Sequence, residues 1–239
     1  MSSTLFISDL HLDAARPAVT RALADFLLKH STCNALYILG DLFESWIGDD
    51  DDAALAQELR SLLKRFSANG PELYIMQGNR DFLLGRSFCD DTGAHLLPDP
   101  SVIDLYGTPT LLMHGDSLCT DDIPYQQFRQ LVRNPLWQQD FLAKTPQERL
   151  QAALEARDAS ATHKGAVDMD IMDVNADQVL NRFIRHGVHR MIHGHTHRPA
   201  IHELEVNGEA AERIVLGDWY TQGSVLRVTP GTYDLAVLA

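Results

Sequence analysis

The chain contains 239 residues, of which 45% are hydrophobic and 22% charged, and its 33 Asp and Glu against 20 Lys and Arg give a formal net charge of -13. We expect a single domain spanning residues 1–239 with a buried core, and the ordinary apolar content excludes intrinsic disorder. The acidic balance disfavours a protein that binds nucleic acid over its whole surface. A phosphorylated substrate would need a local basic patch or bound metal to neutralise its charge.

The sequence contains no evident targeting segment or membrane span. Its first residues, MSSTLFISDLHL, lack the basic start and long apolar run of a signal peptide, and no stretch reaches the ~18 apolar residues of a spanning helix. The three cysteines, Cys33, Cys89 and Cys119, form no C-x-x-C pair, which suits a reducing compartment. We therefore expect a soluble cytoplasmic protein that can still bind a membrane surface.

The first half of the chain alternates short apolar runs with longer amphipathic segments. The pattern predicts strands at Thr4–Ser8, Ala35–Leu39, Leu73–Gln77 and Leu111–His114. It predicts helices between the first three of them, at Arg16–His30 and Ala53–Phe66. After Ile201 only strands are expected, with turns at Asn207-Gly208 and Pro230-Gly231 between strands that include Arg213–Leu216, Ser224–Val228 and Tyr233–Leu238. Strand–helix units followed by antiparallel strands favour an α/β (α+β) fold, a two-sheet β-sandwich flanked by helices.

A run of four acidic residues, Asp49–Asp52, precedes the second predicted helix. Negative charge near a helix N-terminus interacts favourably with the helix dipole. We interpret the run as a solvated loop that stabilises the start of this helix.

Residues 122–176 differ from both flanking regions and predict a helical insertion. Proline stands at three expected helix starts, Pro124, Pro135 and Pro146, and residues 123–167 contain six Lys or Arg against four Asp or Glu. We predict a lid whose apolar face binds a hydrophobic group while its basic residues bind phosphate or an anionic surface. The alternative is an ordinary helical excursion that packs on the body. The residues concerned are Tyr125, Phe128, Leu131, Val132, Trp137, Phe141 and Leu142, with Arg129, Arg133, Arg149, Arg157 and Lys164.

Candidate metal ligands follow the apolar strands at their carboxyl ends, where open α/β sheets form their binding crevice. Asp9 and His11 lie in SDLHL and Asp41 in LGDLFE, and the others are Asn79 in QGNRD, His114 in MHGD, and His195 and His197 in IHGHTH. Residues two apart on an extended chain point to one face. Each of these residues alone could be a helix cap or an incidental histidine. Because such residues follow five different strands, a metal site is favoured.

The chemistry of these donors narrows the choice of metal. Imidazoles, carboxylates and an amide oxygen, without a thiolate, suit Mn²⁺, Fe²⁺ or Zn²⁺ at catalytic positions rather than a structural cysteine site. One carboxylate shared between two ions would hold them ~3.5–4 Å apart, as two-metal hydrolases require.

The motifs D-x-H, G-D, G-N, H-G and G-H-x-H, in this order, resemble the signature of calcineurin-like metallophosphoesterases. The resemblance extends from residue 4 to about 220. It implies that Asp9, His11, Asp41 and His197 hold one ion and that Asp41, Asn79, His114 and His195 hold the other. It also implies that Asp41 bridges the ions and that a hydroxide between them is the nucleophile.

Arg80 departs from the pattern of the broad family, most of whose members read G-N-H-[DE] with a histidine that protonates the leaving group. Here the sequence is Gly78-Asn79-Arg80-Asp81. Arginine cannot act as an acid near neutral pH, but it binds phosphate through two parallel hydrogen bonds. A phosphate monoester expelled from a pyrophosphate needs no proton, so Arg80 favours pyrophosphate cleavage.

Longer matches resemble one branch of this family, the UDP-2,3-diacylglucosamine pyrophosphohydrolases of lipid A biosynthesis. They are SDLHL, LGDLFESWIGDD, GNRDFL, MHGDSLCTDD, IMDVN and IHGHTHRPA. The resemblance implies hydrolysis of UDP-2,3-diacylglucosamine to UMP and 2,3-diacylglucosamine 1-phosphate (lipid X) by a peripheral enzyme on the cytoplasmic face of the bacterial inner membrane. It implies two divalent ions, Mn²⁺ being the usual metal, and a monomer is expected.

The same resemblance implies substrate contacts and, among them, catalytic roles for Asn79, Arg80 and His195. The implied contacts are Asn79, Arg80, Asp122, Ser160, Lys164 and His195. Members often have a lysine where this chain has Val167, whereas Lys164 stands where some have a neutral residue. The basic charge has moved by about one helical turn, which favours Lys164 over position 167.

Two alternatives stay open from the sequence. One is another hydrolase of the same fold, such as a soluble nucleotide pyrophosphatase or other phosphodiesterase. A nuclease would need a basic groove, which the acidic total disfavours. The other is a scaffold that binds partners without catalysis, although such scaffolds lose ligands and every expected position here is filled.

Overall fold

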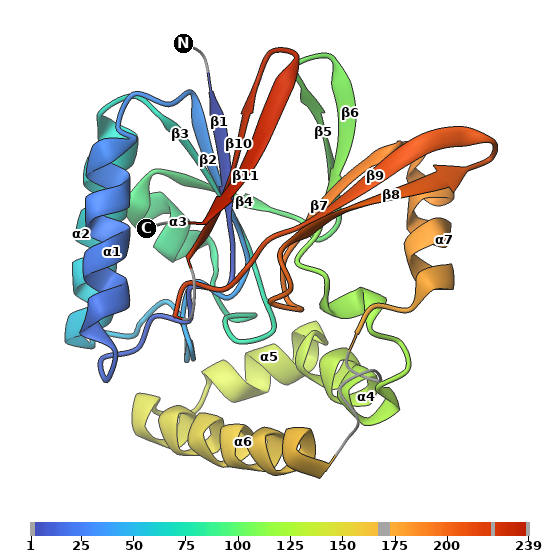
Figure 1. Cartoon of the computed structure of the whole chain (residues 1–239). Coiled ribbons are helices and arrows are strands. Elements are labelled where there is room, and N and C mark those ends of the chain that lie inside the picture. Colours follow the sequence, from blue (N-terminus) through green and yellow to red (C-terminus); the bar gives the residue numbers. More distant parts are fainter. Residues whose placement is uncertain (1–2, 167–172, 221–222, 238–239) are drawn as a thin grey trace.

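The computed structural model describes residues 3–166, 173–220 and 223–237, and of residues 158–166 it describes only the backbone. Two β-sheets pack face to face at the centre, and helices cover their outer faces (Figure 1). The predicted two-sheet sandwich flanked by helices is therefore confirmed.

The larger sheet has six strands in the order β11-β10-β1-β2-β3-β4. Strands β1 to β4 are parallel, and β10 joins β1 in the antiparallel direction. The strands are β1 (Thr4–Ile7), β2 (Ala35–Leu39), β3 (Glu72–Met76), β4 (Ala94–Leu97), β10 (Ser224–Thr229) and β11 (Thr232–Val237). The strands expected in this sheet all occur within a residue of their predicted bounds. β4 is not predicted, because its half-exposed sequence shows neither a continuous apolar run nor a clear alternation.

The smaller sheet has five strands in the order β5-β6-β7-β9-β8, with β7 parallel to both of its neighbours. Its strands are β5 (Ser101–Leu105), β6 (Thr108–Leu112), β7 (Arg190–His193), β8 (Ala200–Val206) and β9 (Glu209–Val215). The turn at Asn207-Gly208 joins β8 to β9, as its positive φ angles require. β6 begins and ends earlier than the strand expected at Leu111–His114, because His114 already belongs to the loop that follows β6. β9 likewise begins earlier than the strand expected at Arg213–Leu216.

Three apolar clusters hold these layers together. Alternate residues of β1 serve two of them, since Leu5 and Ile7 pack toward the helices while Phe6 packs between the sheets. Helices α1 (Pro17–Lys29) and α2 (Ala54–Ala68) cover the larger sheet with their apolar faces, and α7 (Ala176–His186) covers the smaller one. Fully burying one such side chain stabilises the fold by about 1.5–3 kcal/mol.

The acidic run at Asp49–Asp52 has more roles than the sequence predicts. Asp51 Oδ1 accepts from the backbone N–H of Ala53, the residue before α2, although Ala53 itself provides no side-chain cap. Asp49 accepts hydrogen bonds from the backbone N–H groups of Gly85 and Phe88, at the start of α3 (Arg86–Thr92). Asp50 binds Arg149, far away in sequence. The run therefore ties distant segments together, a role that local sequence does not reveal.

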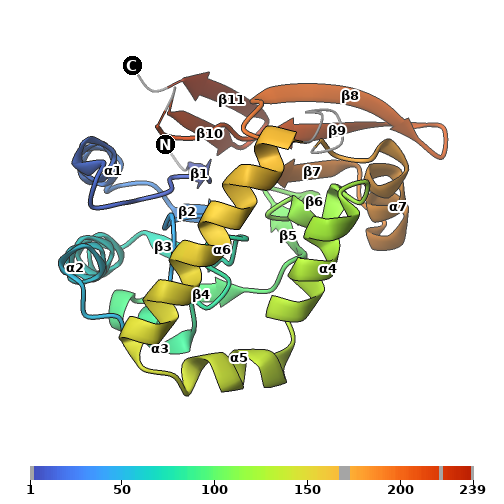
Figure 2. The same cartoon turned by 90° about the horizontal axis from the view of Figure 1, so that it is seen from below.

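Three further helices form a layer across the carboxyl ends of the parallel strands, called the helical layer below (Figures 1 and 2). They are α4 (Ile123–Val132), α5 (Pro135–Leu142) and α6 (Pro146–Ala166). Each has a proline in its first turn, as predicted, because proline fits where no N–H donor is needed. None of the described helices is long and apolar enough to cross a membrane.

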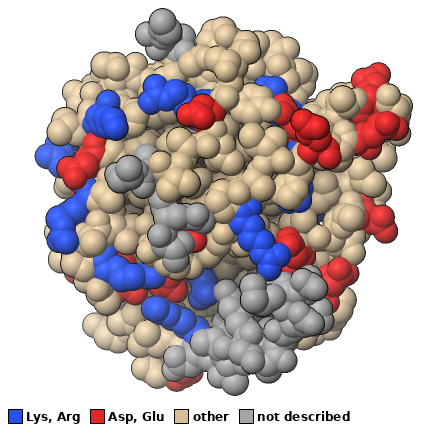
Figure 3. All heavy atoms as spheres, in the orientation of Figure 1, with Lys and Arg blue, Asp and Glu red and all other residues tan. Residues whose placement is uncertain are grey.

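The acidic charge is distributed unevenly over the face seen in Figure 3. Asp and Glu side chains gather over the β8–β9 hairpin, whose exposed residues include Glu203, Glu205 and Glu209. In the same orientation the helical layer lies at the opposite, lower end of the molecule. The acidic hairpin and the helical layer therefore lie at different ends of the molecule.

Candidate functional site

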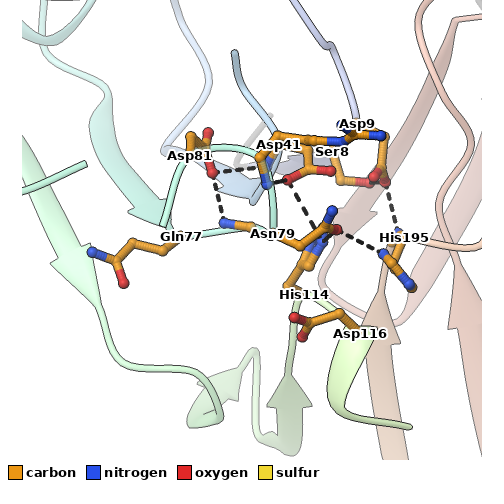
Figure 4. Close-up of polar contacts among 12 residues, drawn as sticks. Ser8, Asp9, Asp41, Gln77, Asn79, Asp81, His114, Asp116 and His195 are labelled. Atoms are coloured by element: carbon orange, nitrogen blue, oxygen red, sulfur yellow. Dashed lines mark hydrogen bonds and ion pairs between the residues drawn. The ribbon is translucent and has the colours of Figure 1, made fainter. Parts of the chain in front are cut away.

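The loops at the carboxyl ends of β1, β2, β3, β6 and β7 bring all seven predicted metal ligands together. They are Asp9, His11, Asp41, Asn79, His114, His195 and His197, and Figure 4 shows how five of them converge. Parallel strands end at the same edge, so residues more than 180 positions apart meet there, as in the hydrogen bond from His195 N to Asp9 Oδ2 (2.8 Å).

Asp9, His11 and His197 form the first group of donors. The Nε2 atoms of the two histidines lie 3.2 Å apart, and Asp9 Oδ1 lies 3.3 Å from His197 Nε2. Asp9 Oδ1 is buried and accepts no hydrogen bond from the described residues. A buried carboxylate oxygen without a donor is costly, and facing imidazole nitrogens give one another little stabilisation. A cation would satisfy all three atoms, so this donor set fits a metal ion.

Asp41 lies between this group and a second one. Its Oδ2 is 3.6 Å from His11 Nε2, and its Oδ1 is 3.8 Å from His114 Nε2. In the second group, Asn79 Oδ1 accepts hydrogen bonds of 2.9 Å from both His114 Nε2 and His195 Nδ1. The two carboxylate oxygens of Asp41 thus face different groups, which is the arrangement that a bridging ligand needs.

The backbone at the site is held in an uncommon conformation. Five of the seven predicted ligands have positive φ angles between 48° and 71°, namely Asp9, His11, Asp41, His195 and His197. The left-handed conformation costs roughly 1–2 kcal/mol for a residue with a side chain. Such strained residues concentrate at functional sites, where the surrounding structure enforces them.

Two glycines explain parts of the motifs. A Cβ atom on Gly78 would lie 2.0 Å from Asp41 Oδ1, and one on Gly194 would lie 2.3 Å from Asp9 Oδ2. Only glycine allows the neighbouring strand to approach each carboxylate so closely. The G-N and G-H-x-H motifs therefore contain glycine because the carboxylates of other loops pack against it.

Burial and neighbouring charges perturb the pKa values in the site. Burial raises the pKa of the Asp41 carboxyl to about 7, although His114 opposes the shift. For His114, burial alone would lower the pKa, but the carboxylates of Asp41 and Asp116 raise it to about 9. Burial lowers the pKa of His11 and of His195 to about 3. Both of these imidazoles are therefore neutral near pH 7 and can offer a lone pair to a metal.

A supporting set of side chains, not identified from the sequence, surrounds the ligands. Buried Asp81 accepts hydrogen bonds from the backbone N–H groups of Gly78 (2.7 Å) and Leu42 (2.7 Å), which joins the loops after β2 and β3. Ser8 Oγ donates to Asp9 Oδ2 (2.6 Å), and Tyr220 Oη lies 3.1 Å from His197 Nδ1. Ser8 and Asp81 lie within the SDLHL and GNRD motifs. Their position next to the ligands in the sequence was the only feature that could have indicated a supporting role.

A cavity of about 390 Å³ opens beside the second group of donors and extends beneath the helical layer. Its walls include Asn79 and Arg80 on the body and three alanines of α6. Most of the remaining lining is apolar: Trp46, Phe82, Tyr125, Phe128, Trp137 and Phe141. An apolar cavity with a few polar groups at one end is typical of a small-molecule site.

The predicted apolar residues of the helical layer divide between this cavity and the core. Phe128 lines the cavity and is 42% exposed, whereas Phe141 also lines it but is 8% exposed and packs in the main apolar cluster. Val132 is buried. The helical layer therefore has features of both alternatives. Phe128 suits a lid over a cavity, whereas Phe141 and Val132 suit helices that pack on the body.

Three of the basic residues expected to bind phosphate or an anionic surface bind groups of the protein itself. Arg129 Nε donates to Asp116 Oδ2 (2.8 Å), and Arg133 Nη2 donates to the carbonyl oxygen of Gly78 (2.8 Å). Arg149 is 1% exposed and donates to Ile47 O (2.6 Å). These guanidinium groups join the helices to the body and satisfy polar groups of its loops.

The predicted substrate contacts fall into two groups. Arg80 lines the cavity, and its backbone N–H donates to Asp41 Oδ1 (2.7 Å). Asp122 also lines the cavity and caps α4 by accepting from Tyr125 N (3.0 Å). Ser160 and Lys164 belong to α6, but their side chains lie outside the described part of the structure, as does Val167 altogether.

Comparisons with known proteins agree with this geometry. The family model "Calcineurin-like phosphoesterase" matches residues 2–199. A protein of Stenotrophomonas maltophilia (strain K279a) named "UDP-2,3-diacylglucosamine hydrolase" is 51% identical over 99% of both chains. Proteins of the same name from Pseudomonas paraeruginosa and Xanthomonas axonopodis pv. citri are 52% and 50% identical over 95% and 99% of both chains. The chain therefore belongs to the calcineurin-like phosphoesterases and, within them, to the family of the UDP-2,3-diacylglucosamine hydrolases.

Proposed function

We propose that this chain hydrolyses the pyrophosphate bond of UDP-2,3-diacylglucosamine and releases UMP and 2,3-diacylglucosamine 1-phosphate (lipid X), a step of lipid A biosynthesis. The names of relatives at about 50% identity support the choice of substrate. The observation that supports it most directly is the cavity, because its apolar interior adjoins Asn79, Arg80 and the converging metal ligands. A lipid-linked pyrophosphate needs both environments side by side.

Two divalent ions, Mn²⁺ by the family resemblance, complete the site in this proposal. Asp9, His11, Asp41 and His197 would hold one ion, and Asp41, Asn79, His114 and His195 the other, with support from the distances between their donor atoms. Such ions, when bound, neutralise phosphate charge and lower the pKa of water to about 7.

The side chains of the chain itself have distinct roles in the reaction. Arg80, with its guanidinium at the cavity wall, neutralises the phosphate that leaves when the bond to the bridging oxygen breaks. That phosphate needs no proton donor, because its charge is delocalised. Asn79 and His195 contact each other at 2.9 Å and orient the reacting phosphate in line with the water. Asp122, Ser160 and Lys164 are proposed as further substrate contacts.

Residues 122–176 act as a lid in this proposal, within the single domain of residues 1–239. The apolar lining that α4, α5 and α6 contribute would bind the acyl chains, and each buried methylene would contribute at most ~0.8 kcal/mol. The three arginines that join these helices to the body favour a lid that stays attached at several points.

The substrate is membrane-bound, so we also propose peripheral attachment to the cytoplasmic face of the inner membrane by a monomeric enzyme. Exposed apolar side chains on the helical layer support the orientation: Ile123, Phe128, Leu131, Leu136, Leu142, Leu150 and Leu154. The acidic β8–β9 hairpin lies at the other end of the molecule, away from anionic lipid (Figures 1 and 3). Apolar insertion contributes more to this attachment than the sequence suggests, because Arg129, Arg133 and Arg149 are already paired.

The proposal is tested by incubating Mn²⁺-loaded protein with UDP-2,3-diacylglucosamine in mixed micelles and measuring UMP. A deacylated UDP-sugar and a simple phosphodiester serve as comparison substrates. We expect rapid UMP release from the diacylated substrate alone. Equal rates on the deacylated sugar would favour a soluble nucleotide pyrophosphatase, and a metal-loaded protein that hydrolyses none of the three would contradict an enzymatic role.

A further inference from the structure

Glu44 lies at the junction of the metal ligands and the cavity, although neither the sequence motifs nor the proposed reaction assigns it a role. It follows β2, and its backbone N–H donates to Leu12 O (3.1 Å), next to a bridge between Leu12 and Phe43. Its side chain is 12% exposed. The backbone contacts hold the carboxylate in place between two loops of the body.

On one side, the Glu44 carboxylate faces the first group of metal ligands. Its Oε2 lies 3.5 Å from His11 Nδ1, an atom that is buried and makes no hydrogen bond within the described residues. The same Oε2 accepts from Arg16 Nη2 (2.8 Å), which also donates to His11 O (2.9 Å). Glu44 therefore contacts the His11 side chain directly and its backbone through Arg16.

This contact determines which nitrogen of His11 is available to a cation. The Nε2 atom points toward Asp41 and His197, so only Nδ1 faces Glu44. A carboxylate beside Nδ1 favours the tautomer with its proton there, which leaves the Nε2 lone pair free. Carboxylates in this position orient metal-binding histidines in many proteins, and their removal weakens metal binding.

On the other side, Glu44 faces two arginines of the cavity. Its Oε1 lies 3.9 Å from Arg80 Nη1 and 3.4 Å from Arg157 Nε, and all three residues line the cavity. Arg157 comes from α6, so this is a contact between the body and the helical layer. Arg157 also lies 3.5 Å from Asp13 Oδ2. Two carboxylates, those of Glu44 and Asp13, therefore face the three guanidinium groups of Arg16, Arg80 and Arg157. These pairs leave an excess of positive charge beside the cavity, where a phosphate can bind.

We propose that Glu44 is a positioning residue that couples the two halves of the site. Its Oε2 orients His11 for the metal, and its Oε1 holds Arg80 and Arg157 toward the substrate phosphate. Only the role of Glu44 toward Arg80 and Arg157 rests on the proposed function, because the effect on His11 is measurable without any substrate.

The test compares Glu44→Gln, which keeps the size of the side chain and removes its charge, with Glu72→Gln. Glu72 is a matched control because it also lies beside a histidine, His95 at 3.2 Å, but is exposed. Mn²⁺ affinity is measured by titration of metal-free protein, and kcat and KM with the diacylated substrate. For Glu44→Gln we expect the Mn²⁺ site that includes His11 to lose about tenfold in affinity. At saturating Mn²⁺, kcat should fall about tenfold while KM changes less than about threefold, because the arginines lose their position but keep their charge.

Glu44→Asp, which keeps the charge on a shorter side chain, should recover part of the Mn²⁺ affinity. Mn²⁺ affinity within twofold of wild type in Glu44→Gln would overturn the proposal, whatever happens to turnover. A metal-free Glu44→Gln protein that melts far below Glu72→Gln would also overturn it, because Glu44 would then be a folding residue. If wild-type protein does not cleave the diacylated substrate, the proposed function fails, but the Mn²⁺ titration still decides the role of Glu44.

Discussion

The two sides of the site are built differently. The body wall comprises the loops that carry the metal ligands and the body residues that line the cavity beside them. Its ligands are polar and mostly buried, and five of them have positive φ angles, whereas Trp46, Phe82 and Leu83 make part of its cavity surface apolar. The helical wall consists of aromatic and small apolar side chains on regular helices, and parts of the same helices are exposed. The body wall therefore uses a strained backbone to hold a few polar donor atoms in place. The helical wall provides apolar contact area and does not fix polar groups in this way.

The charges of the helical wall point toward the body. Arg129, Arg133 and Arg149 reach acidic or carbonyl oxygens of the loops below, and Arg157 reaches Glu44. Basic residues on an amphipathic helix suggest an anionic partner, but here that partner is largely the protein itself. The difference between the walls can be tested by changing one wall at a time.

The largest effect is expected from Asp41→Ala on the body wall. Removing this carboxylate takes away the donor whose two oxygens face the two groups of ligands. We expect at least a ~10³-fold loss of kcat/KM and fewer bound metal ions, because two cations would then repel each other without a shared anion. Metal analysis and initial rates measure both. Asp25→Ala, at an exposed position of α1, is the control. Normal turnover with two ions in Asp41→Ala would exclude the dinuclear site.

Arg80→Ala should separate charge neutralisation from metal binding on the same wall. We expect kcat to fall about 10²-fold with metal content unchanged, because guanidinium is not a ligand. Arg80→Lys should recover only part of the rate, since a point charge does not reproduce the planar fork. Loss of metal from Arg80→Ala would show that the residue has a structural role instead.

Arg149→Met tests whether the helical wall is attached by its buried arginine. The change removes hydrogen bonds to Asp50 and leaves Ile47 O without its donor, so we expect the free energy of unfolding to fall by about 2 kcal/mol. Chemical denaturation measures this change, with Arg185→Met, at an exposed position of α7, as the control. Faster proteolysis within α6 should accompany it. Equal stability of both variants would mean that α6 does not depend on this anchor.

Phe128→Ser tests the apolar character of the helical wall with the smallest expected effect. We expect KM for the diacylated substrate to rise about tenfold and the rate on a deacylated UDP-sugar to stay unchanged, because the lost apolar contact involves the acyl chains alone. Leu28→Ser, at an exposed position of α1 outside the cavity lining and outside the helical layer, is the control. Phe141 is unsuitable for this test because it packs in the core. Equal losses on both substrates would assign Phe128 to packing.

Much of the body wall could be predicted from the sequence because its elements are local. Each ligand stands directly after an apolar strand, and the strands at Ala35–Leu39 and Ser224–Thr229 occur almost as expected. The approach of Gly78 to Asp41 and of Gly194 to Asp9 explains why the short motifs contain glycine. The missed strands, β4 and β5, lack a continuous apolar run, so periodicity could not reveal them.

The sequence by itself determined most of the strands, the identity of the donor atoms and the helix starts at three prolines, because these depend on residues within a few positions of one another. Only the tertiary structure decided the partners of long charged side chains. Arginine reaches several ångströms from its backbone, so sequence alone could not show that Arg149 binds Asp50 or that Glu44 faces His11 and Arg157. Charge pairing depends on which loops are adjacent in the folded protein. The packing of the sheets against the helical layer determines which loops these are.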